Sequence, residues 1–281
     1  ILTGISLPPF FFILKEKLNK EDNILFSSDR YILIFLVFYK FFFRLKFKIC
    51  SDWHMYLERW KNKLIVQKSD YLITTSRKLK KLIIDKSGLK MDKIKTVYGG
   101  VDLSCYDISV DVKLQRKRFN LPEDKKLVGY VGLFKTMRVE KGIDFMIKSL
   151  PQIDSNIHMV FVGARDNEKN EYLTMAEKLD VKDRVHVFEM QKFKEMALLE
   201  MIMDVLVIPY PDQPHFRDYG FPMKVYEYMA AKRPIVYSML GLTEEVLFNC
   251  GFGYIPDDRD SFVKAINYVI NKNIIGWTLL L

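Results

Sequence analysis

The chain of 281 residues is poor in cysteine, glycine and proline. Its three cysteines, Cys50, Cys105 and Cys250, are widely spaced, which argues against a disulfide framework or a cysteine-rich zinc site and favours a reducing compartment. Thirteen glycines and ten prolines do not fit a collagen-like or low-complexity chain. With 49% hydrophobic residues the chain is also unlike a disordered one, so we expect one large or two ordinary globular domains.

No apolar run reaches the roughly 20 residues that a membrane-spanning helix needs. The apolar residues 31–39 are followed by Lys40 and then Phe41–Phe43. We interpret 31–43 as a core helix. The alternative is a helix on a membrane surface, because basic and aromatic residues flank it. The chain begins with Ile1, without a secretory leader pattern, and stops in an apolar segment, so we expect a fragment.

Positive charge is concentrated in the first 100 residues, which contain 20 Lys and Arg against 9 Asp and Glu. The remaining residues contain 24 against 26. A basic half suggests a phosphorylated substrate, an anionic membrane surface or nucleic acid, although a Lys-rich composition on solvated helices would look the same. We predict no nucleic-acid partner, because the aromatic residues of this half fit a core. The expected location is the cytoplasm, with attachment to the inner face of the membrane.

Short apolar strands alternate with helices from residue 127 onward. The expected strands are 127–131, 157–162, 184–188, 204–208, 234–237 and 252–255, and the expected helices between and after them are 142–150, 168–179, 192–203, 223–231, 243–248 and 260–270. This alternation is typical of βαβ units in a parallel α/β sheet, and right-handed crossovers make it a doubly wound, Rossmann-like domain.

A second, shorter alternation runs through residues 22–103. Strands are expected at 23–26, 47–50, 71–74 and 94–97, with helices at 30–43, 55–68 and 76–87. We therefore expect a partial N-terminal domain (1–108), a linker (109–125) and a C-terminal Rossmann-like domain (126–281). Ligands of open α/β sheets bind beyond the carboxyl ends of the strands, so the chemistry is expected in those loops, in a cleft between the domains.

Three segments at expected strand ends carry chemically useful side chains. The loop after the first C-terminal strand contains Gly132, Lys135, Arg138 and Lys141 and leads into a helix, which suits a diphosphate. The alternative is a basic surface loop, because the segment matches neither a Walker loop nor a G-x-G-x-x-G fingerprint.

The second segment is the Ala-rich helix that carries Glu227, whose carboxylate could accept hydrogen bonds from a sugar diol. A buried carboxylate needs partners, so the alternative is a Glu227 that is ion-paired with Lys224 or Arg233. The third segment contains His54, directly after the strand 47–50, where a structural histidine is the alternative. No His, Asp and Glu cluster has metal-ligand spacing, so we predict no metal.

Five segments, in order, resemble the signatures of family 4 glycosyltransferases with the GT-B fold. The most specific is residues 221–236, which are similar to "P-x-K-x-x-E-Y-M-A-x-x-x-P-V-V". The others are 69–76, similar to "A-D-x-I-x-x-x-S"; 97–102, similar to "I-x-N-G-V-D"; 131–142, similar to "V-G-R-x…K-G"; and 204–209, similar to "A-D-V-x-V-x-P". The resemblance covers roughly residues 45–270.

This resemblance implies two facing Rossmann-like domains. It also implies transfer of a sugar from a nucleotide diphosphate sugar to a glycan or lipid-linked acceptor, with retention and without a cofactor. Glu227 would bind the donor ribose, and Lys141, with Arg138 or Lys135, would neutralise the leaving diphosphate. His54 matches the family's acceptor-domain histidine. The further residues implied at the donor are Gly132, Tyr219, Phe221, Pro222, Met223 and Lys224.

The sequence also departs from the family pattern. Tyr219 stands where the family often has a second Glu, eight positions before Glu227, and Leu133 replaces the usual Arg after the loop glycine. The first strands of the acceptor domain and the C-terminal crossing helix have no counterpart here. One alternative is therefore an inactive GT-B remnant that binds nucleotide or membrane without turnover. Another is a nucleotide-sugar 2-epimerase, which the helix around Glu227 disfavours.

Overall fold

The computed structural model describes residues 23–136, 139–219 and 222–272. The chain divides into two compact units. The first ends at Tyr98, and the second comprises residues 99–218 together with residues from Pro222 onward. Each unit has its own hydrophobic core, and each is described by itself.

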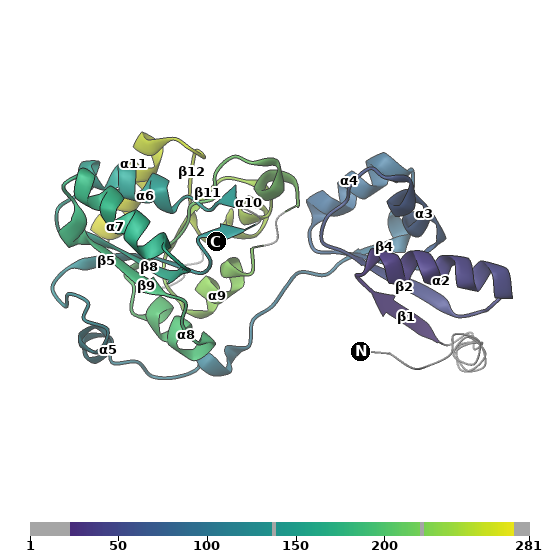
Figure 1. Cartoon of the computed structure of the whole chain (residues 1–281), viewed down its shortest axis with the longest axis horizontal. Coiled ribbons are helices and arrows are strands. Elements are labelled where there is room, and N and C mark those ends of the chain that lie inside the picture. The colour runs from purple at the N-terminus through teal and green to yellow at the C-terminus, as the bar shows by residue number, and fades with distance from the viewer. Residues whose placement is uncertain (1–22, 137–138, 220–221, 273–281) are drawn as a thin grey trace. The chain divides into compact units, whose positions relative to one another are not determined.

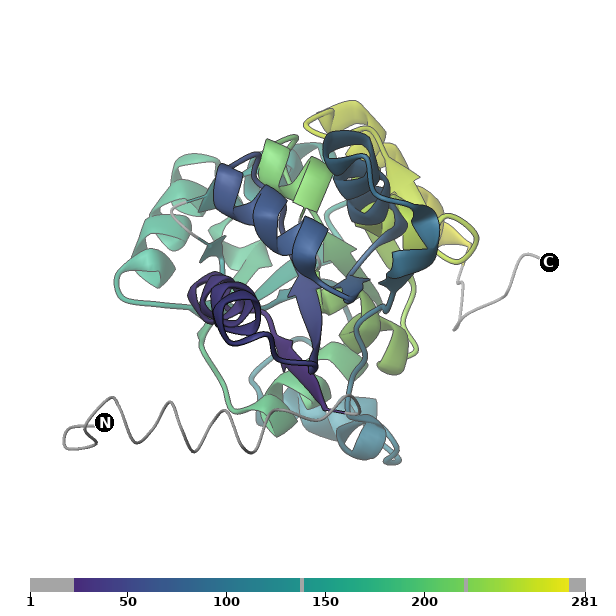
Figure 2. The same cartoon turned by 90° about the vertical axis from the view of Figure 1, so that its right-hand side faces the viewer.

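The first unit is a four-stranded parallel sheet whose spatial order follows the chain. Its strands are β1 (Ile24–Ser27), β2 (Lys48–Trp53), β3 (Tyr71–Thr74) and β4 (Ile94–Thr96). The helices α2 (Arg30–Phe43), α3 (Trp60–Lys68) and α4 (Arg77–Ser87) connect successive neighbours. Right-handed crossovers in one direction place all three on one face of the sheet, where α2 packs on α3 and α3 on α4 (Figures 1 and 2).

Helix α2 has one buried side and one exposed aromatic side. Asp29 caps its first turn by accepting hydrogen bonds from two backbone N–H groups, and Leu33, Leu36 and Val37 pack into the core. The other side exposes Phe35, Phe38, Phe41 and Phe42. The prediction of a core helix therefore holds for the buried side of α2 and not for its exposed aromatic side. Among the described residues, no helix is long and apolar enough to span a bilayer.

The second unit is a six-stranded parallel sheet in the order β12-β11-β10-β5-β8-β9. Its strands are β5 (Lys126–Val131), β8 (Ile157–Ala164), β9 (Val185–Glu189), β10 (Val205–Ile208), β11 (Ile235–Ser238) and β12 (Phe252–Tyr254). The chain proceeds outward from β5 to β9, then returns to the other side of β5 at β10. This is the doubly wound order, with its switch point between β5 and β10, so the predicted α/β fold is confirmed.

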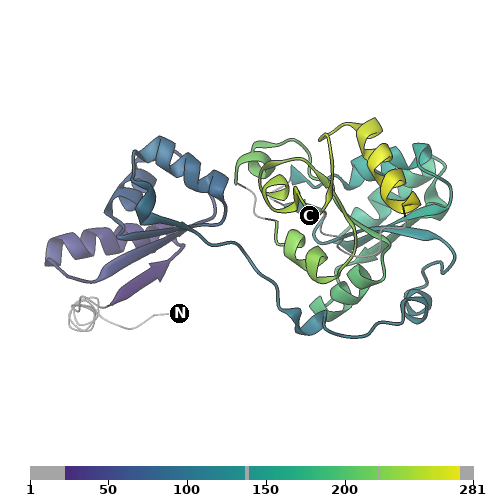
Figure 3. The ribbon, with the colours of Figure 1, turned by 180° about the vertical axis from the view of Figure 1, so that it is seen from behind.

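Helices cover both faces of this sheet, as the doubly wound order requires. They are α6 (Ile143–Ser149), α7 (Glu168–Lys178), α8 (Phe193–Met201), α9 (Lys224–Ala230), α10 (Gly241–Leu247) and α11 (Arg259–Asn271). Helices α6 and α11 pack on one another in Figure 1, and Figure 3 shows α11, in yellow, from behind. The central strands are buried on both sides, which explains their continuous apolar sequences.

Residues 99–125 belong to the second unit and include a short helix, α5 (Val112–Arg118). The guanidinium of Arg116 is buried, donates to the carbonyl of Ile202 and pairs with Asp204 at 2.8 Å. The observed division between Tyr98 and Gly99 therefore differs from the expected boundary at residue 108 and the expected linker 109–125. A charged, Pro-containing segment gave no sign of these buried contacts.

Local differences from the expected elements lie near the strand ends. The loop after Gly132 folds into a hairpin of β6 (Lys135–Thr136) and β7 (Val139–Glu140), which periodicity did not indicate because each strand has two residues. Strand β2 extends to Trp53, and α3 begins at Trp60 rather than at residue 55. A π-helical turn, His215–Tyr219, occupies the long loop after β10.

Gly142 fixes the path of the chain where the hairpin loop meets β10. Its φ of +87° favours glycine, and a Cβ there would lie 1.9 Å from the carbonyl oxygen of Pro209. We expect Gly142→Ala to destabilise the second unit by about 3 kcal/mol or more, because backbone would have to move. Gly100→Ala, where a Cβ meets nothing within 4 Å, is the control in the same unit. Chemical denaturation measures both, and equal stabilities would contradict the prediction.

Candidate functional site

The switch point of the second unit brings a glycine against a lysine. Gly132 follows β5 directly, with φ +144°, and its N–H donates to the carbonyl of Val162 at 2.7 Å. A Cβ on Gly132 would lie 2.6 Å from the Cε of Lys224, at the start of α9. The absence of a side chain at Gly132 therefore lets Lys224 cross the end of β5.

Two carboxylates hold the ammonium group of Lys224. Its Nζ forms an ion pair with Oε2 of Glu227, one turn along α9, and lies 3.4 Å from Oε1 of Glu200 on α8. The Glu200 side chain is 1% exposed, and its Oε2 accepts a hydrogen bond from the Tyr106 hydroxyl at 2.7 Å. Lys224 therefore pairs both with the buried Glu200 and with Glu227, the carboxylate selected from the sequence.

Glu200 is the more deeply buried of the two acids. Its burial raises its pKa to about 7, although the charge of Lys224 and the hydrogen bond from Tyr106 both act to lower it. The negative charge of Glu227 adds to the burial effect that raises the pKa values of Tyr130, Tyr210 and Tyr228. These phenols stay neutral and can donate hydrogen bonds beneath the site.

Lys141 is the second cation at this end of the sheet. Its backbone N–H donates to the carbonyl of Phe134 at 2.9 Å, and the next residue is Gly142, which packs on Pro209, directly after β10. Burial, and then the charge of Lys224, lowers the pKa of Lys141 to about 8. Burial, and then the charge of Lys141, also lowers the pKa of His215. The side chain of Lys141 therefore remains a cation at neutral pH, in an environment that disfavours its charge.

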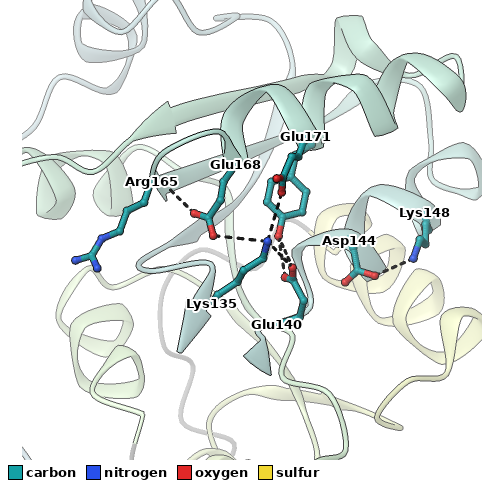
Figure 4. Close-up of polar contacts among 8 residues, drawn as sticks. Lys135, Glu140, Asp144, Lys148, Arg165, Glu168 and Glu171 are labelled. Atoms are coloured by element: carbon teal, nitrogen blue, oxygen red, sulfur yellow. Dashed lines mark hydrogen bonds and ion pairs between the residues drawn. The ribbon is translucent and has the colours of Figure 1, made fainter. Parts of the chain in front are cut away.

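Lys135 has a different environment from the one expected. Its Nζ lies 3.2 Å from Glu140, 3.4 Å from Glu171 and 3.9 Å from Glu168, as Figure 4 shows. Glu140 also accepts a hydrogen bond from the hydroxyl of Tyr172. Three carboxylates thus surround the ammonium group of Lys135, and its expected role at a diphosphate stays a prediction. Its contacts join the β6–β7 hairpin to α7.

The first unit contains a separate pair at the end of β2. Nε2 of His54 lies 3.1 Å from Oδ2 of Asp52, and the His54 side chain is 63% exposed. The two residues line a cavity of about 110 Å³ together with Ser28 and Arg30, which precede and begin α2. The predicted position of His54 at a strand end is therefore observed, and its partner Asp52 is a residue that we had not selected.

The other predicted donor residues lie beside α9 or outside the described residues. Pro222 is buried, and the carbonyls of Pro222 and Met223 accept hydrogen bonds from the first turn of α9. Phe221 and Arg138 lie outside the described residues, and Tyr219 is described only as backbone at the end of the π-helical turn. Among the residues that the structure describes, no group of three metal-ligating side chains occurs.

Sequence reasoning missed Glu200 and Tyr106, which complete the environment of Lys224. Glu200 lies in a helix whose sequence, FKEMALLEM, has no feature that separates Glu200 from Glu195. Tyr106 lies in the segment that we interpreted as leading into a linker. The sequence did point to one part of this environment, because the alternative interpretation of Glu227 was an ion pair with Lys224 or Arg233. The structure shows the pair with Lys224.

A family model described as "Glycosyl transferases group 1" matches residues 125–272. The chain belongs to the group 1 glycosyltransferases. The match includes Gly132, Lys141, Glu200, Lys224 and Glu227, and it confirms the resemblance drawn from the five signatures.

Several named proteins align with this chain. An uncharacterized glycosyltransferase MJ1607 of Methanocaldococcus jannaschii is 26% identical over 214 residues, covering 74% of this chain and 53% of that protein. Spore coat protein SA of Bacillus subtilis is 29% identical over 219 residues, covering 72% and 56%. A D-inositol 3-phosphate glycosyltransferase of Xylanimonas cellulosilytica is 24% identical, covering 72% and 48%. The chain spans about half the length of these relatives.

Solved structures show the same fold. A glycosyltransferase from Rickettsia africae has a TM-score of 0.77 at 15% identity, covering 96% of this chain and 74% of that one. Anabaena Alr3699/HepE, solved in complex with UDP, has a TM-score of 0.76 at 17% identity, covering 94% and 73%. HepE was also solved with UDP and glucose and with UDP-glucose. At these identities the likeness establishes the GT-B-like fold alone.

Glu200 should make the stability of the second unit depend on pH. Its folded pKa of about 7 exceeds the ordinary 4.5, so the folded state binds more protons between these values and stability falls as pH rises through them. We expect Glu200→Gln to flatten this dependence. Tyr106→Phe, which keeps the acid but removes its hydrogen bond, should retain it. Urea denaturation at pH 5, 6 and 7.5 measures the effect, and parallel curves for wild type and Glu200→Gln would contradict it.

Proposed function

We propose that this group 1 glycosyltransferase moves a sugar from a nucleotide diphosphate sugar to a glycan or lipid-linked acceptor, with retention of anomeric configuration. The observation that carries the proposal is the pairing of Lys224 with Glu227 at the switch point, beside Gly132 and near the half-buried Lys141. Ligands of doubly wound sheets bind at this position. A nucleotide diphosphate presents two chemistries there, a ribose diol and a diphosphate.

Glu227 and the two lysines suit these two chemistries. The carboxylate of Glu227 can accept hydrogen bonds from the ribose diol, while the ammonium groups of Lys141 and Lys224 face the diphosphate. As the glycosidic bond breaks, negative charge develops on the departing diphosphate. Cations held in place before the reaction stabilise that charge without reorganisation, which is a large term in catalysis of this kind. Glu200 is a positioning residue in this scheme, because it holds Lys224 from the protein side.

On the acceptor side, we assign His54 with Asp52 to the first unit's part of the reaction. Asp52 orients the imidazole through the 3.1 Å contact with Nε2, which leaves Nδ1 to face other groups. The cavity beside them is open at a strand end, where acceptor hydroxyls could reach His54. Attachment to an anionic membrane surface through the basic first unit remains part of this proposal.

An inactive remnant that binds nucleotide without turnover is the second candidate, and one observation favours it. Three carboxylates surround Lys135, so its charge is already compensated within the protein. The two candidates differ in turnover alone, so release of nucleotide diphosphate from a bound donor separates them. A 2-epimerase would instead release a free sugar epimer.

Thermal unfolding with UDP, GDP, ADP and their common sugars tests the donor site. A ligand at 100 times its dissociation constant stabilises by about 2.7 kcal/mol, which raises the melting temperature of a unit of this size by roughly 5–10 °C. UDP is the first choice, because HepE was solved with it. We expect one nucleotide to give the shift and Glu227→Ala to abolish it. Glu123→Ala, an exposed carboxylate in the same unit, should leave it unchanged.

A nucleotide shift that persists in Glu227→Ala would remove Glu227 from the donor site. No shift with any nucleotide, in a chain that unfolds cooperatively, would contradict the donor proposal itself.

Nucleotide affinity should fall as Lys141 loses its proton. With a pKa of about 8, Lys141 is mostly charged at pH 7 and mostly neutral at pH 9, so affinity should drop about tenfold over this interval. Lys141→Arg stays charged, and its affinity should stay level. Calorimetric titrations of both proteins at each pH make the comparison, and an equal drop in both would show that another group titrates.

A further inference from the structure

A groove in the first unit lies between the beginnings of α2 and α3. Its volume is about 590 Å³, and Arg30, Tyr31, Arg59, Trp60 and Lys61 line it. Both helices begin at the edge of the sheet where the parallel strands end, which is the edge that carries His54. The function proposed above gives no role to any of these five side chains.

Two aromatic rings in this groove are exposed to solvent. Tyr31 is 75% exposed and Trp60 is 66% exposed. The Nζ of Lys61 lies 5.5 Å from the centroid of the Tyr31 ring and 5.7 Å from that of Trp60, so one ammonium group lies over both rings. Large exposed aromatic surface rimmed by charge is typical of a binding site, because its exposure to water is unfavourable without an occupant.

The charge of the groove is positive. In the described part of the chain, neither Arg30 nor Arg59 forms an ion pair within 4.0 Å, and the ammonium group of Lys61 lies over aromatic rings. Of the described residues that line this groove, Asp29 is the one acid, and its Oδ1 accepts hydrogen bonds from the backbone N–H groups of Tyr31 and Ile32, at 2.8 and 3.0 Å. Three cations against one carboxylate among these residues leave the groove with an excess of positive charge, and guanidinium groups can bind an anion bidentately.

The groove adjoins the cavity beside His54, because Ser28 and Arg30 line both spaces. A ligand in the groove would therefore lie next to the cavity of the imidazole that we assign to the acceptor reaction. This proximity ties the groove to the acceptor rather than to an unrelated ligand.

We propose that the groove binds an anionic sugar unit of the acceptor, with its carboxylate or phosphate on Arg30 and Arg59. The C–H face of the sugar ring packs against Trp60 and Tyr31. This inference rests on the proposed function, since it names the chemistry of the acceptor. A neutral sugar would use the rings but leave both guanidinium groups without an anion, so the groove discriminates by charge.

The test is calorimetric titration of the full chain with trigalacturonate, with neutral maltotriose as the matched ligand. We expect trigalacturonate to bind and maltotriose to bind at least about tenfold more weakly, the loss expected without charge-assisted hydrogen bonds. Arg59→Gln and Trp60→Ala should each lose a similar factor, whereas Trp60→Phe, which keeps a ring, should recover part of it. Inorganic phosphate alone should bind more weakly than trigalacturonate.

The controls are residues of the same unit outside the groove. Lys95→Gln removes an exposed cation on β4, and Phe41→Ala removes an exposed ring at the far end of α2, so both should bind trigalacturonate like the wild type. Absence of trigalacturonate binding, equal binding of maltotriose, or an equal loss in Phe41→Ala and Trp60→Ala would each overturn the inference. The last result would favour an extended apolar surface such as a bilayer contact.

Nucleotide binding, measured in the same samples, separates this inference from the proposed function. A chain that binds nucleotide but not trigalacturonate keeps its donor site and loses the groove assignment. A chain that binds trigalacturonate but no nucleotide keeps a sugar-binding groove and loses the glycosyltransferase proposal.

Discussion

The candidate donor site depends on one half-buried lysine shared by two carboxylates. Lys224 crosses the end of β5 beside Gly132, where a Cβ would lie 2.6 Å from its Cε, and its charge is balanced by Glu227 and Glu200. Removing either carboxylate changes the charge of the trio and leaves the lysine with a single partner. The strand order brings the loop after β5 and the start of α9 together at the switch point, and this backbone arrangement places the charged trio there.

The order of strands in the sheet explains why Lys141 and Lys224 lie near one another. Because the chain returns to the far side of β5 at β10, the loop after β5 and the helix after β10 meet at one edge. Lys141 comes from the first of these and Lys224 from the second, so their like charges lie close enough for Lys224 to lower the pKa of Lys141. Burial contributes more to this lowering than Lys224 does, so an anion bound beside Lys141 would raise its pKa again.

Most of the second unit could be predicted from sequence because its central strands are largely apolar and have glycine or proline near their ends. Gly132 follows β5, Pro209 follows β10, and Gly163 is the last residue but one of β8; the order of these strands follows from right-handed crossovers. Side-chain partners could not be predicted in the same way. Nothing in the sequence shows that Lys135 meets three carboxylates from β7 and α7, or that Glu200 rather than Glu195 turns inward. These depend on helix rotation and on a hairpin too short to have a period.

The first unit was harder to interpret because its composition points in several directions at once. An aromatic, basic segment fits a core helix, a membrane contact or a ligand groove, and α2 contains elements of each: Leu33 and Val37 are buried, Phe41 is exposed along its far end, and Tyr31 lines a groove. Periodicity could assign the buried side, since it follows the helical repeat. It could not distinguish Tyr31 from Phe41, because both fall on the exposed side. The neighbouring helix distinguishes the two residues. Among the described residues, α3 brings Trp60 and Lys61 to Tyr31 and brings no such pair to Phe41. The groove with its cations needs both helices, so the pattern of one helix could not predict it.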